Sequence, residues 1–531
     1  MYMVMETCYK DSMYMSNNKQ KWSEQEDRHS TLLSNAQAVR AVTAAVEGTL
    51  GPKGLDTMLV SRNGDVIVTN DGVTILDLME ITHPAAKMLI NIARAQQDEI
   101  GDGTTTATLL AGALVQEACA HVQTGVPVTR VIEGIQQGIS RALEEIQARS
   151  RPLEQVDDPR LLQVARIAGR EHGDIASLVV KAAQLMGLEK LRDPSFRLSE
   201  MIVSSVGATS EVFHGLLLNK QRMSPHMPEK VEKTWVFLLD DALEAEGIDE
   251  EALRTETGFQ TYLQYKEEFR QSVRRLIDLG VRFICTGRGV SPVAEEMLTE
   301  AGVFVVQRVS SRDMRRLADY TGARPVKRTG LHKSPDELKK MLGWCAHVYQ
   351  DKRMDMIRLE GGHGKPMATI LVGATTAEVV GERARIAKDA ASSVQAAVRG
   401  GIVPGGGALE LYISRVIEKY REKVRGMAAY GVDAVAKALR RPITQIVLNA
   451  GFNPLEKIED ANAGQIHTNC DSLAIDCESG EVVDMMKRGV LDPTLVKYHA
   501  LKAAGEVAVA VLRIQTIVRM RSDGMEDQGG F

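Results

Sequence analysis

The chain has 531 residues, enough for about three domains that each bury a core of their own. Its 65 basic and 70 acidic residues give a net charge of −5, and this near balance does not favour a nucleic-acid-binding surface. No apolar run is long enough to span a bilayer, and charged residues interrupt the N-terminal segment where a signal peptide needs an apolar core. Six scattered cysteines without a Cys-x-x-Cys pair argue against a disulfide framework or a zinc site. We therefore expect a cytoplasmic protein that does not bind membranes.

The first third of the chain predicts a helix and a hairpin after a disordered extension over residues 1–30. The helix is expected over 34–48. Apolar segments at 57–61 and 65–69 then flank Asn63-Gly64, a pair typical of tight β-turns. A two-stranded hairpin has open edges and is only marginally stable alone. On local sequence alone, the hairpin packs on its own domain.

Helices are expected to dominate residues 85–149 and 406–464, with Pro442 interrupting the second region. The middle third instead alternates short apolar strands with helices. The strands are expected at 236–239, 281–285 and 303–306, and the helices at 261–279 and 292–301, ending at Gly280 and Gly302. This alternation predicts a parallel sheet. The pattern therefore indicates a multi-domain protein with α-rich ends around an α/β insertion.

Residues 101–107, Gly-Asp-Gly-Thr-Thr-Thr-Ala, form the most informative segment and stand at the start of a predicted helix. A helix N-terminus has unpaired N–H groups and positive partial charge, so it attracts phosphate. Asp102 would repel a bare phosphate, but a Mg²⁺ ion between them takes oxygen ligands from both. The alternative is that Asp102 and Thr104 only cap the helix.

Three further turns suggest a nucleotide site assembled from distant parts of the chain: Leu50-Gly51-Pro52-Lys53-Gly54, Asn70-Asp71-Gly72, and the glycine-rich residues 400–407. The usual phosphate-binding motif is absent, because the chain's Gly364-Lys365 pair is followed by Pro366.

The order LGPKG, NDG, GDGTTTAT and VPGGG resembles the chaperonin ATPases, and the resemblance runs from about Ser34 to about Val518. Further segments resemble the group II, thermosome-like branch: 54–59, 83–87, 219–220, 227–228, 449–451 and 480–484. Two positions depart from that branch. Asp492 stands where many group II members carry Glu, and Arg170 is a possible substitute for a lysine that senses the γ-phosphate. The C-terminus also lacks a Gly-Gly-Met tail. These mixed features are similar to a thermosome-like chaperonin of bacterial type (group III).

The resemblance implies three domains. Residues 31–145 and 404–531 would form a discontinuous, mostly α-helical equatorial ATPase domain, and 146–210 with 363–403 a small α/β intermediate hinge domain. Residues 211–362 would form an α/β apical domain with a helical protrusion at about 241–270. The protrusion would be a built-in lid, so that no separate co-chaperonin is needed. By composition alone, the stretch also fits a solvated helix on the outer face of the sheet.

The resemblance also implies a function for particular residues. ATP and Mg²⁺ would be the cofactors, unfolded polypeptides the clients, and stacked rings of this chain the assembly. Asp102 would bind the metal, while Asp389 and Asp71 would act on the attacking water. The nucleotide would contact Leu50, Gly51, Pro52, Lys53, Asp102, Gly103, Thr104, Thr105, Thr106, Gly406, Gly407 and Asp492.

Each of these roles has a plainer alternative. Lys53 also fits a solvated turn lysine, Asp71 an ordinary turn residue, and Asp389 an exposed helical residue paired with Lys388 or Arg385. For the whole protein, the alternatives are a phosphotransferase of low oligomeric state that uses Mg-ATP, or a nucleotide-dependent scaffold that does not fold clients.

Overall fold

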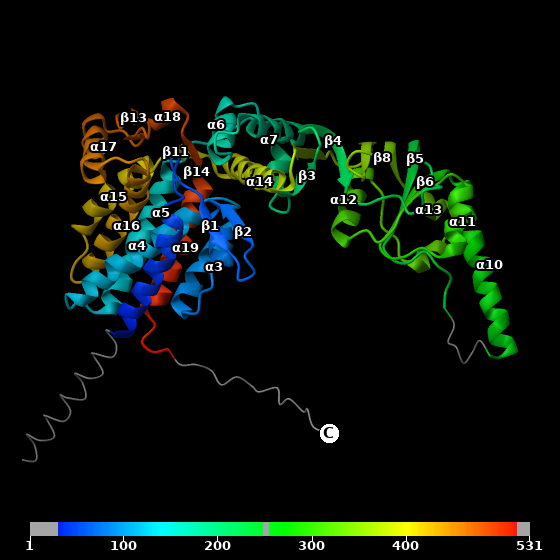
Figure 1. Cartoon of the computed structure of the whole chain (residues 1–531), viewed down its shortest axis with the longest axis horizontal. Coiled ribbons are helices and arrows are strands. Elements are labelled where there is room, and N and C mark those ends of the chain that lie inside the picture. Colours follow the sequence, from blue (N-terminus) through cyan, green and yellow to red (C-terminus); the bar gives the residue numbers. More distant parts are fainter. Residues whose placement is uncertain (1–29, 248–253, 518–531) are drawn as a thin grey trace, which may run out of the picture. The chain divides into compact units, whose positions relative to one another are not determined.

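The computed structural model describes residues 30–247 and 254–517, drawn in colour in Figure 1. The expected N-terminal extension, apart from residue 30, and a small part of the expected protrusion lie outside these residues. The described chain divides into two compact units. The first contains residues up to 154, 158–170 and 392 onwards, and the second contains 155–157 and 171–391. No helix of the described residues is long and apolar enough to cross a membrane. The division into three domains stays a prediction.

The first unit is a helical body built from both ends of the chain. Its core is aliphatic and combines residues such as Leu89, Leu114 and Ile135 with Val435 and Leu501. Its helices cover residues 30–47, α2 (Gly72–Leu78), α3 (Pro84–Glu99), α4 (Thr104–Gln123), α5 (Val128–Ala148), α6 (Pro159–Ala168), α15 (Ala408–Arg421), α16 (Ala428–Asn449), α17 (Pro454–Thr468), α18 (Met485–Arg488) and α19 (Thr494–Leu512).

Three small two-stranded sheets complete this unit, and all three are antiparallel. They pair β1 (Thr57–Val60) with β2 (Val66–Thr69), β11 (Ile402–Pro404) with β14 (Leu491–Pro493), and β12 (Leu473–Ile475) with β13 (Val482–Asp484). The first pair confirms the hairpin around Asn63-Gly64. Its side chains Met58, Val60, Val66 and Val68 are exposed in the single chain.

The expectation that Pro442 interrupts a helix is wrong, because α16 continues through it from Ala428 to Asn449. A proline inside a helix costs about 3 kcal/mol, since it removes one main-chain hydrogen bond and crowds the preceding turn. Pro442 is buried, and α16 packs against α4, α5 and α15. Tertiary packing therefore outweighs the local preference at this position.

The second unit is built around an eight-stranded sheet in the order β3-β10-β4-β9-β8-β5-β6-β7. The strands are β3 (Ile202–Val206), β4 (Glu211–Leu218), β5 (Lys230–Leu239), β6 (Val281–Thr286), β7 (Phe304–Val306), β8 (Gly343–Asp351), β9 (Met356–Gly362) and β10 (Ala368–Ala374). The prediction of a parallel sheet holds for β5, β6 and β7 but is wrong for the whole sheet, which is mixed. The pair β8–β9 is antiparallel because only four residues join the two strands, too few for a crossover.

Helices cover both faces of this sheet. Along β5, Val236 and Leu238 enter one apolar cluster, whereas Phe237 and Leu239 enter the other, as the two-residue period of a strand requires. The helices of this unit are α7 (Gly173–Met186), α8 (Leu188–Arg192), α10 (Glu256–Asp278), α11 (Pro292–Glu300), α12 (Ser311–Thr321) and α13 (Pro335–Lys339), with 3-10 turns at Leu198–Met201 and Arg328–His332. A further helix, α14 (Ala377–Gly400), continues into the first unit.

Helix α10 carries most of the described part of the predicted protrusion. It starts earlier than expected, because the Thr255 side chain accepts a hydrogen bond from the Gly258 N–H and caps it. Only its second half, from Phe269 onwards, has buried side chains, while Phe259 and Leu263 are exposed. Among the described residues, the first half of α10 therefore packs against no apolar core (Figure 1).

Candidate nucleotide site

The Gly-Asp-Gly turn places Asp102 immediately before helix α4. Gly101 and Gly103 have φ values of +84° and +80°, which glycine adopts without steric cost. The N-cap residue is Gly103 itself, so no side chain caps this helix start. Asp102 Oδ1 instead accepts from the N–H of Gly103 at 2.6 Å. This geometry does not support the alternative in which Asp102 only caps the helix.

Two neighbouring elements fix Asp102. The Ser393 hydroxyl on α14 donates to Oδ2, and the Gln96 amide on α3 donates to the Asp102 carbonyl oxygen at 2.7 Å. Burial raises the pKa of Asp102, the Ser393 hydrogen bond lowers it, and the nearby charge of Asp492 raises it again. Among the described residues, no basic side chain forms a direct ion pair with Asp102. The result is a desolvated carboxylate without a direct cationic partner.

This donor set fits a metal that takes most of its ligands from substrate and water. The described residues contain no cluster of three or more His, Cys, Asp or Glu side chains that could enclose an ion. Mg²⁺ binds proteins in this sparse way, through one or two carboxylates together with phosphate oxygens and water. Asp102 thus fits Mg²⁺ bound together with a nucleotide.

The Asn70-Asp71-Gly72 turn lies against the threonine run of α4. A Cβ atom on Gly72 would come 2.5 Å from Thr105 Oγ1 and 3.3 Å from Thr104 Oγ1, so only glycine fits here without movement. Asp71 caps α2, since its Oδ2 accepts from the N–H of Thr74 at 3.1 Å. Its other oxygen, Oδ1, has no hydrogen-bond partner among the described residues. Thr106 completes the first turn of α4.

Asn449 holds the turn over residues 50–54. Its segment, 449–451, was noted above only for its resemblance to the group II branch. Asn449, at the end of α16, donates from Nδ2 to the carbonyl oxygens of Glu47 at 2.9 Å and Leu50 at 2.8 Å. Gly51 has a φ of +88°, followed by Pro52. Lys53 lies 3.9 Å from Glu478 and both side chains are exposed, which agrees with the solvated lysine.

The glycine-rich turn after β11 meets Asp492. Val403 pairs with Asp492 across the β11–β14 ladder. A Cβ atom on Gly405 would come 3.1 Å from the carboxylate carbon and from both carboxylate oxygens of Asp492. Gly406 follows with a φ of +63°, and Gly407, with a φ of +78°, is the N-cap of α15. The structure therefore brings these glycines and Asp492 together.

A buried lysine that the sequence analysis did not identify completes this side of the site. Lys497 Nζ on α19 lies 2.6 Å from Glu410 Oε1 and 2.8 Å from Asp492 Oδ2. The spacing of Asp492 and Lys497 along the chain is a weak signal for this contact, and Glu410 is far away in sequence. Only the tertiary contact between Glu410 on α15 and Lys497 on α19 reveals the cluster.

Asp389 belongs to the second compact unit, whereas Asp102 belongs to the first. It is half-buried and lies on α14, one helical turn before Ser393, so the two residues share a face of that helix. Arg385, one of its proposed alternative partners, pairs with Glu382 at 3.3 Å. The role of Asp389 stays a prediction.

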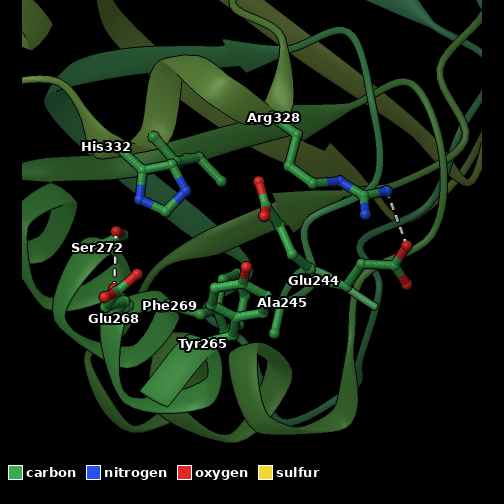
Figure 2. Close-up of a pocket in the computed structure, with 10 residues that line it drawn as sticks. Glu244, Ala245, Tyr265, Glu268, Phe269, Ser272, Arg328 and His332 are labelled. Atoms are coloured by element: carbon green, nitrogen blue, oxygen red, sulfur yellow. Dashed lines mark hydrogen bonds and ion pairs between the residues drawn. The ribbon is translucent and has the colours of Figure 1, made fainter. Parts of the chain in front are cut away.

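A separate small pocket in the second unit lies beside α10 (Figure 2). Glu244, Glu246 and Glu268 make it acidic, and its one arginine, Arg328, is paired with Glu244 at 2.8 Å. An acidic pocket whose arginine is already engaged is unsuited to a phosphorylated small molecule. The phosphotransferase alternative is therefore not favoured by this pocket.

Comparison with known proteins identifies the family. The model of the TCP-1/cpn60 chaperonin family matches residues 42–522. The chain belongs to this family. A thermosome subunit of Pyrococcus abyssi is 32% identical over 516 residues, covering 93% of this chain and 92% of the relative. The thermosome subunit beta of Aeropyrum pernix is 34% identical over 504 residues, covering 92% of this chain and 91% of the relative.

The fold of this chaperonin also matches a solved structure, the crystal structure of a group III chaperonin in the open state. The TM-score is 0.85 at 45% sequence identity, and the match covers 93% of this chain and all of that chain. The predicted family, its thermosome-like type and its multi-domain α and α/β fold are confirmed.

Proposed function

We propose that the four turns described above form the site at which this chaperonin binds and hydrolyses ATP. Thermosome-type chaperonins are ATPases that assemble into rings and act on unfolded protein, and this chain is an ATP-dependent chaperonin. The observation that carries the assignment of the site is the contact of Gly72 with Thr104 and Thr105 beside the desolvated Asp102.

The first turn of α4 would hold the phosphates. The N–H groups at a helix start bind anions, and the hydroxyls of Thr104, Thr105 and Thr106 add further donors. Asp102 would hold Mg²⁺, which, when bound, neutralises developing charge on the phosphate oxygens. The hydrogen bonds from Gly103 and Ser393 keep the Asp102 side chain oriented for this contact.

Asp389 and Asp71 would act on the attacking water. Oδ1 of Asp71 is available, because its cap of α2 uses only Oδ2. The support for Asp389 is the family resemblance together with its place one turn before Ser393 on α14. A carboxylate that orients water contributes typically 10²- to 10⁴-fold to the rate.

Asp492 would accept a hydrogen bond from the nucleoside, with Gly405–Gly407 allowing close approach of the ligand to the backbone. We further propose that α10 and the segment before it form a built-in lid over clients inside the ring, without a separate co-chaperonin. The cysteines in the described part of the chain are unpaired, which fits a cytoplasmic location.

Replacement of the metal-binding carboxylate tests the site. Asp102→Ala should lower the rate of Mg²⁺-dependent ATP hydrolysis by at least about 10²-fold. Native mass spectrometry should still detect rings. Asp98→Ala, an exposed carboxylate on α3, is the control and should keep full activity. A normal Mg²⁺ titration in Asp102→Ala would refute the ligand assignment. If wild-type protein formed rings but did not hydrolyse ATP, the alternative of a scaffold that does not fold clients would be favoured.

A further inference from the structure

The cluster around Lys497 joins the proposed nucleoside side of the site to a buried acid outside it. The ammonium group lies between Glu410 Oε1 and Asp492 Oδ2, at 2.6 and 2.8 Å. The Lys497 side chain is 10% exposed and that of Glu410 is 5% exposed. One buried cation therefore serves two carboxylates from separate elements.

The cluster depends on a charged lysine. Burial alone would lower the pKa of Lys497, but the carboxylates of Asp492 and Glu410 outweigh it and raise the pKa. Among the described residues, no other cation pairs with either acid. Removing the ammonium would leave two carboxylates in a desolvated place without compensation, which is strongly unfavourable.

The same contact fixes how Asp492 points. Its Oδ2 is taken by Lys497, and its carboxylate group lies close against Gly405. Oδ1 has no hydrogen-bond partner in the part of the chain that the structure describes. The side chain therefore has one anchored oxygen and one oxygen left for a ligand.

Lys497 also affects the metal side of the site. The negative charge of Asp492 raises the pKa of Asp102, and the positive charge of Lys497 lowers it. Lys497 therefore offsets part of the electrostatic effect of Asp492 on Asp102.

We propose that Lys497 is a positioning residue for nucleotide selection: it anchors Asp492 Oδ2 so that Oδ1 accepts from a ribose hydroxyl of ATP. This inference rests on the proposed nucleoside role of Asp492. Lys497 itself does not touch the nucleotide in this arrangement. Glu410 holds the same ammonium group through its Oε1.

A double-mutant cycle tests the proposal, with steady-state ATPase kinetics on ATP and 2′-deoxyATP. Asp492→Asn and Lys497→Met should each raise KM for ATP about tenfold, change kcat less than about twofold, and reduce the preference for ATP over 2′-deoxyATP. The double variant Asp492→Asn/Lys497→Met should be no worse than Asp492→Asn, because Lys497 acts through Asp492. Lys502→Met, an exposed lysine on the same helix, is the matched control and should behave as wild type.

A second comparison uses Glu410→Gln/Lys497→Met, which keeps the net charge of the cluster at its native value and removes the second unpaired carboxylate. This variant should show the same loss of ribose preference. A purely structural lysine would lower thermal stability but leave the ratio of the two KM values unchanged.

The outcomes separate the nucleoside role of Asp492 from the positioning role of Lys497. An unchanged KM and unchanged ribose preference in Asp492→Asn would overturn the nucleoside role of Asp492 itself. Altered kinetics in Asp492→Asn, with wild-type ribose preference in both Lys497 variants, would overturn the positioning role alone. If the increases in KM of the two single variants multiply in the double variant, the positioning role of Lys497 is overturned as well.

Discussion

The Ser393 hydroxyl donates a hydrogen bond to Asp102 Oδ2 and joins two residues that are 291 positions apart. Ser393 lies on α14 and is fully buried, and the preceding Ser392 lies so close to Gly101 that a Cβ there would come 2.3 Å from its hydroxyl oxygen. The turn that we propose to hold Mg²⁺ is thus packed on α14. This is the helix that carries Asp389 one turn earlier.

Removal of this hydroxyl should shift the pH dependence of ATP hydrolysis. Asp102 must be ionised to bind a cation, so activity falls as the pH drops through the Asp102 pKa. The Ser393 hydrogen bond lowers that pKa, and Ser393→Ala should raise it. The acidic limb of the pH–rate profile should therefore move to higher pH, by about one unit if the bond contributes about 1.4 kcal/mol. An acidic limb that stays in place, or moves to lower pH, would contradict the role of Asp102.

The close fit of Gly72 should make it intolerant of any side chain. In Gly72→Ala the new methyl group would meet Thr105 Oγ1 at 2.5 Å, so the NDG turn or the start of α4 must move. We expect the KM for ATP to rise about tenfold or more, because misplacement by 1 Å at a reacting site has costs of this size. Gly48→Ala is the control, since a Cβ atom there meets nothing within 4 Å. Equal kinetics in both variants would show that the turn does not shape the site.

Asp389→Ala should separate hydrolysis from binding. If Asp389 orients the attacking water, turnover should fall about 10²- to 10⁴-fold while the Kd for ATP changes less than about threefold. Single-turnover hydrolysis and equilibrium binding of ATP measure the two effects. Lys388→Ala, its exposed neighbour on α14, should keep both values. A parallel loss of ATP binding in Asp389→Ala would show that the residue holds nucleotide rather than water.

Short-range sequence patterns predicted the turns and helix ends of the fold well. Asn63-Gly64 marks the hairpin, α10 ends just before Gly280, and α11 ends just before Gly302. These features depend on residues close in sequence, where backbone preferences decide the outcome. Pro442 shows the limit of this reasoning, because long-range packing keeps α16 intact there.

The candidate site was predicted through its glycines and acids but not through the residues that hold them. Ser393 and Lys497 contact Asp102 and Glu410 across tens to hundreds of residues. Gln96 contacts Asp102 across only six residues, but like the other two it stands in no motif. Periodicity and turn chemistry carry no information on which helix faces meet. The mixed sheet was missed for a related reason: the strand β8 and its partner β9 were not recognised, so the sequence pattern included only the parallel part.

Deletion of the protrusion should remove client enclosure and leave the ATPase. The structure sets the limits of the cut. Leu243 is fully buried and Glu244 pairs with Arg328, while buried side chains on α10 begin at Phe269. Replacing residues 247–264 by a short Gly-Ser linker therefore spares the described core of the second unit.

We expect this variant to form rings and hydrolyse ATP at a rate within about twofold of wild type, because no proposed site residue is removed. A bound, protease-sensitive client should be digested in the presence of ATP, whereas wild-type protein should protect it. The double substitution Phe259→Ser/Leu263→Ser provides a finer test, since both side chains are exposed on the first half of α10. If Phe259 and Leu263 contact neighbouring lids in the closed ring, the double substitution should weaken protection of the client from protease. It should not change α10 in the open state. Full client protection by the deletion variant would contradict the built-in lid and favour a solvated helix.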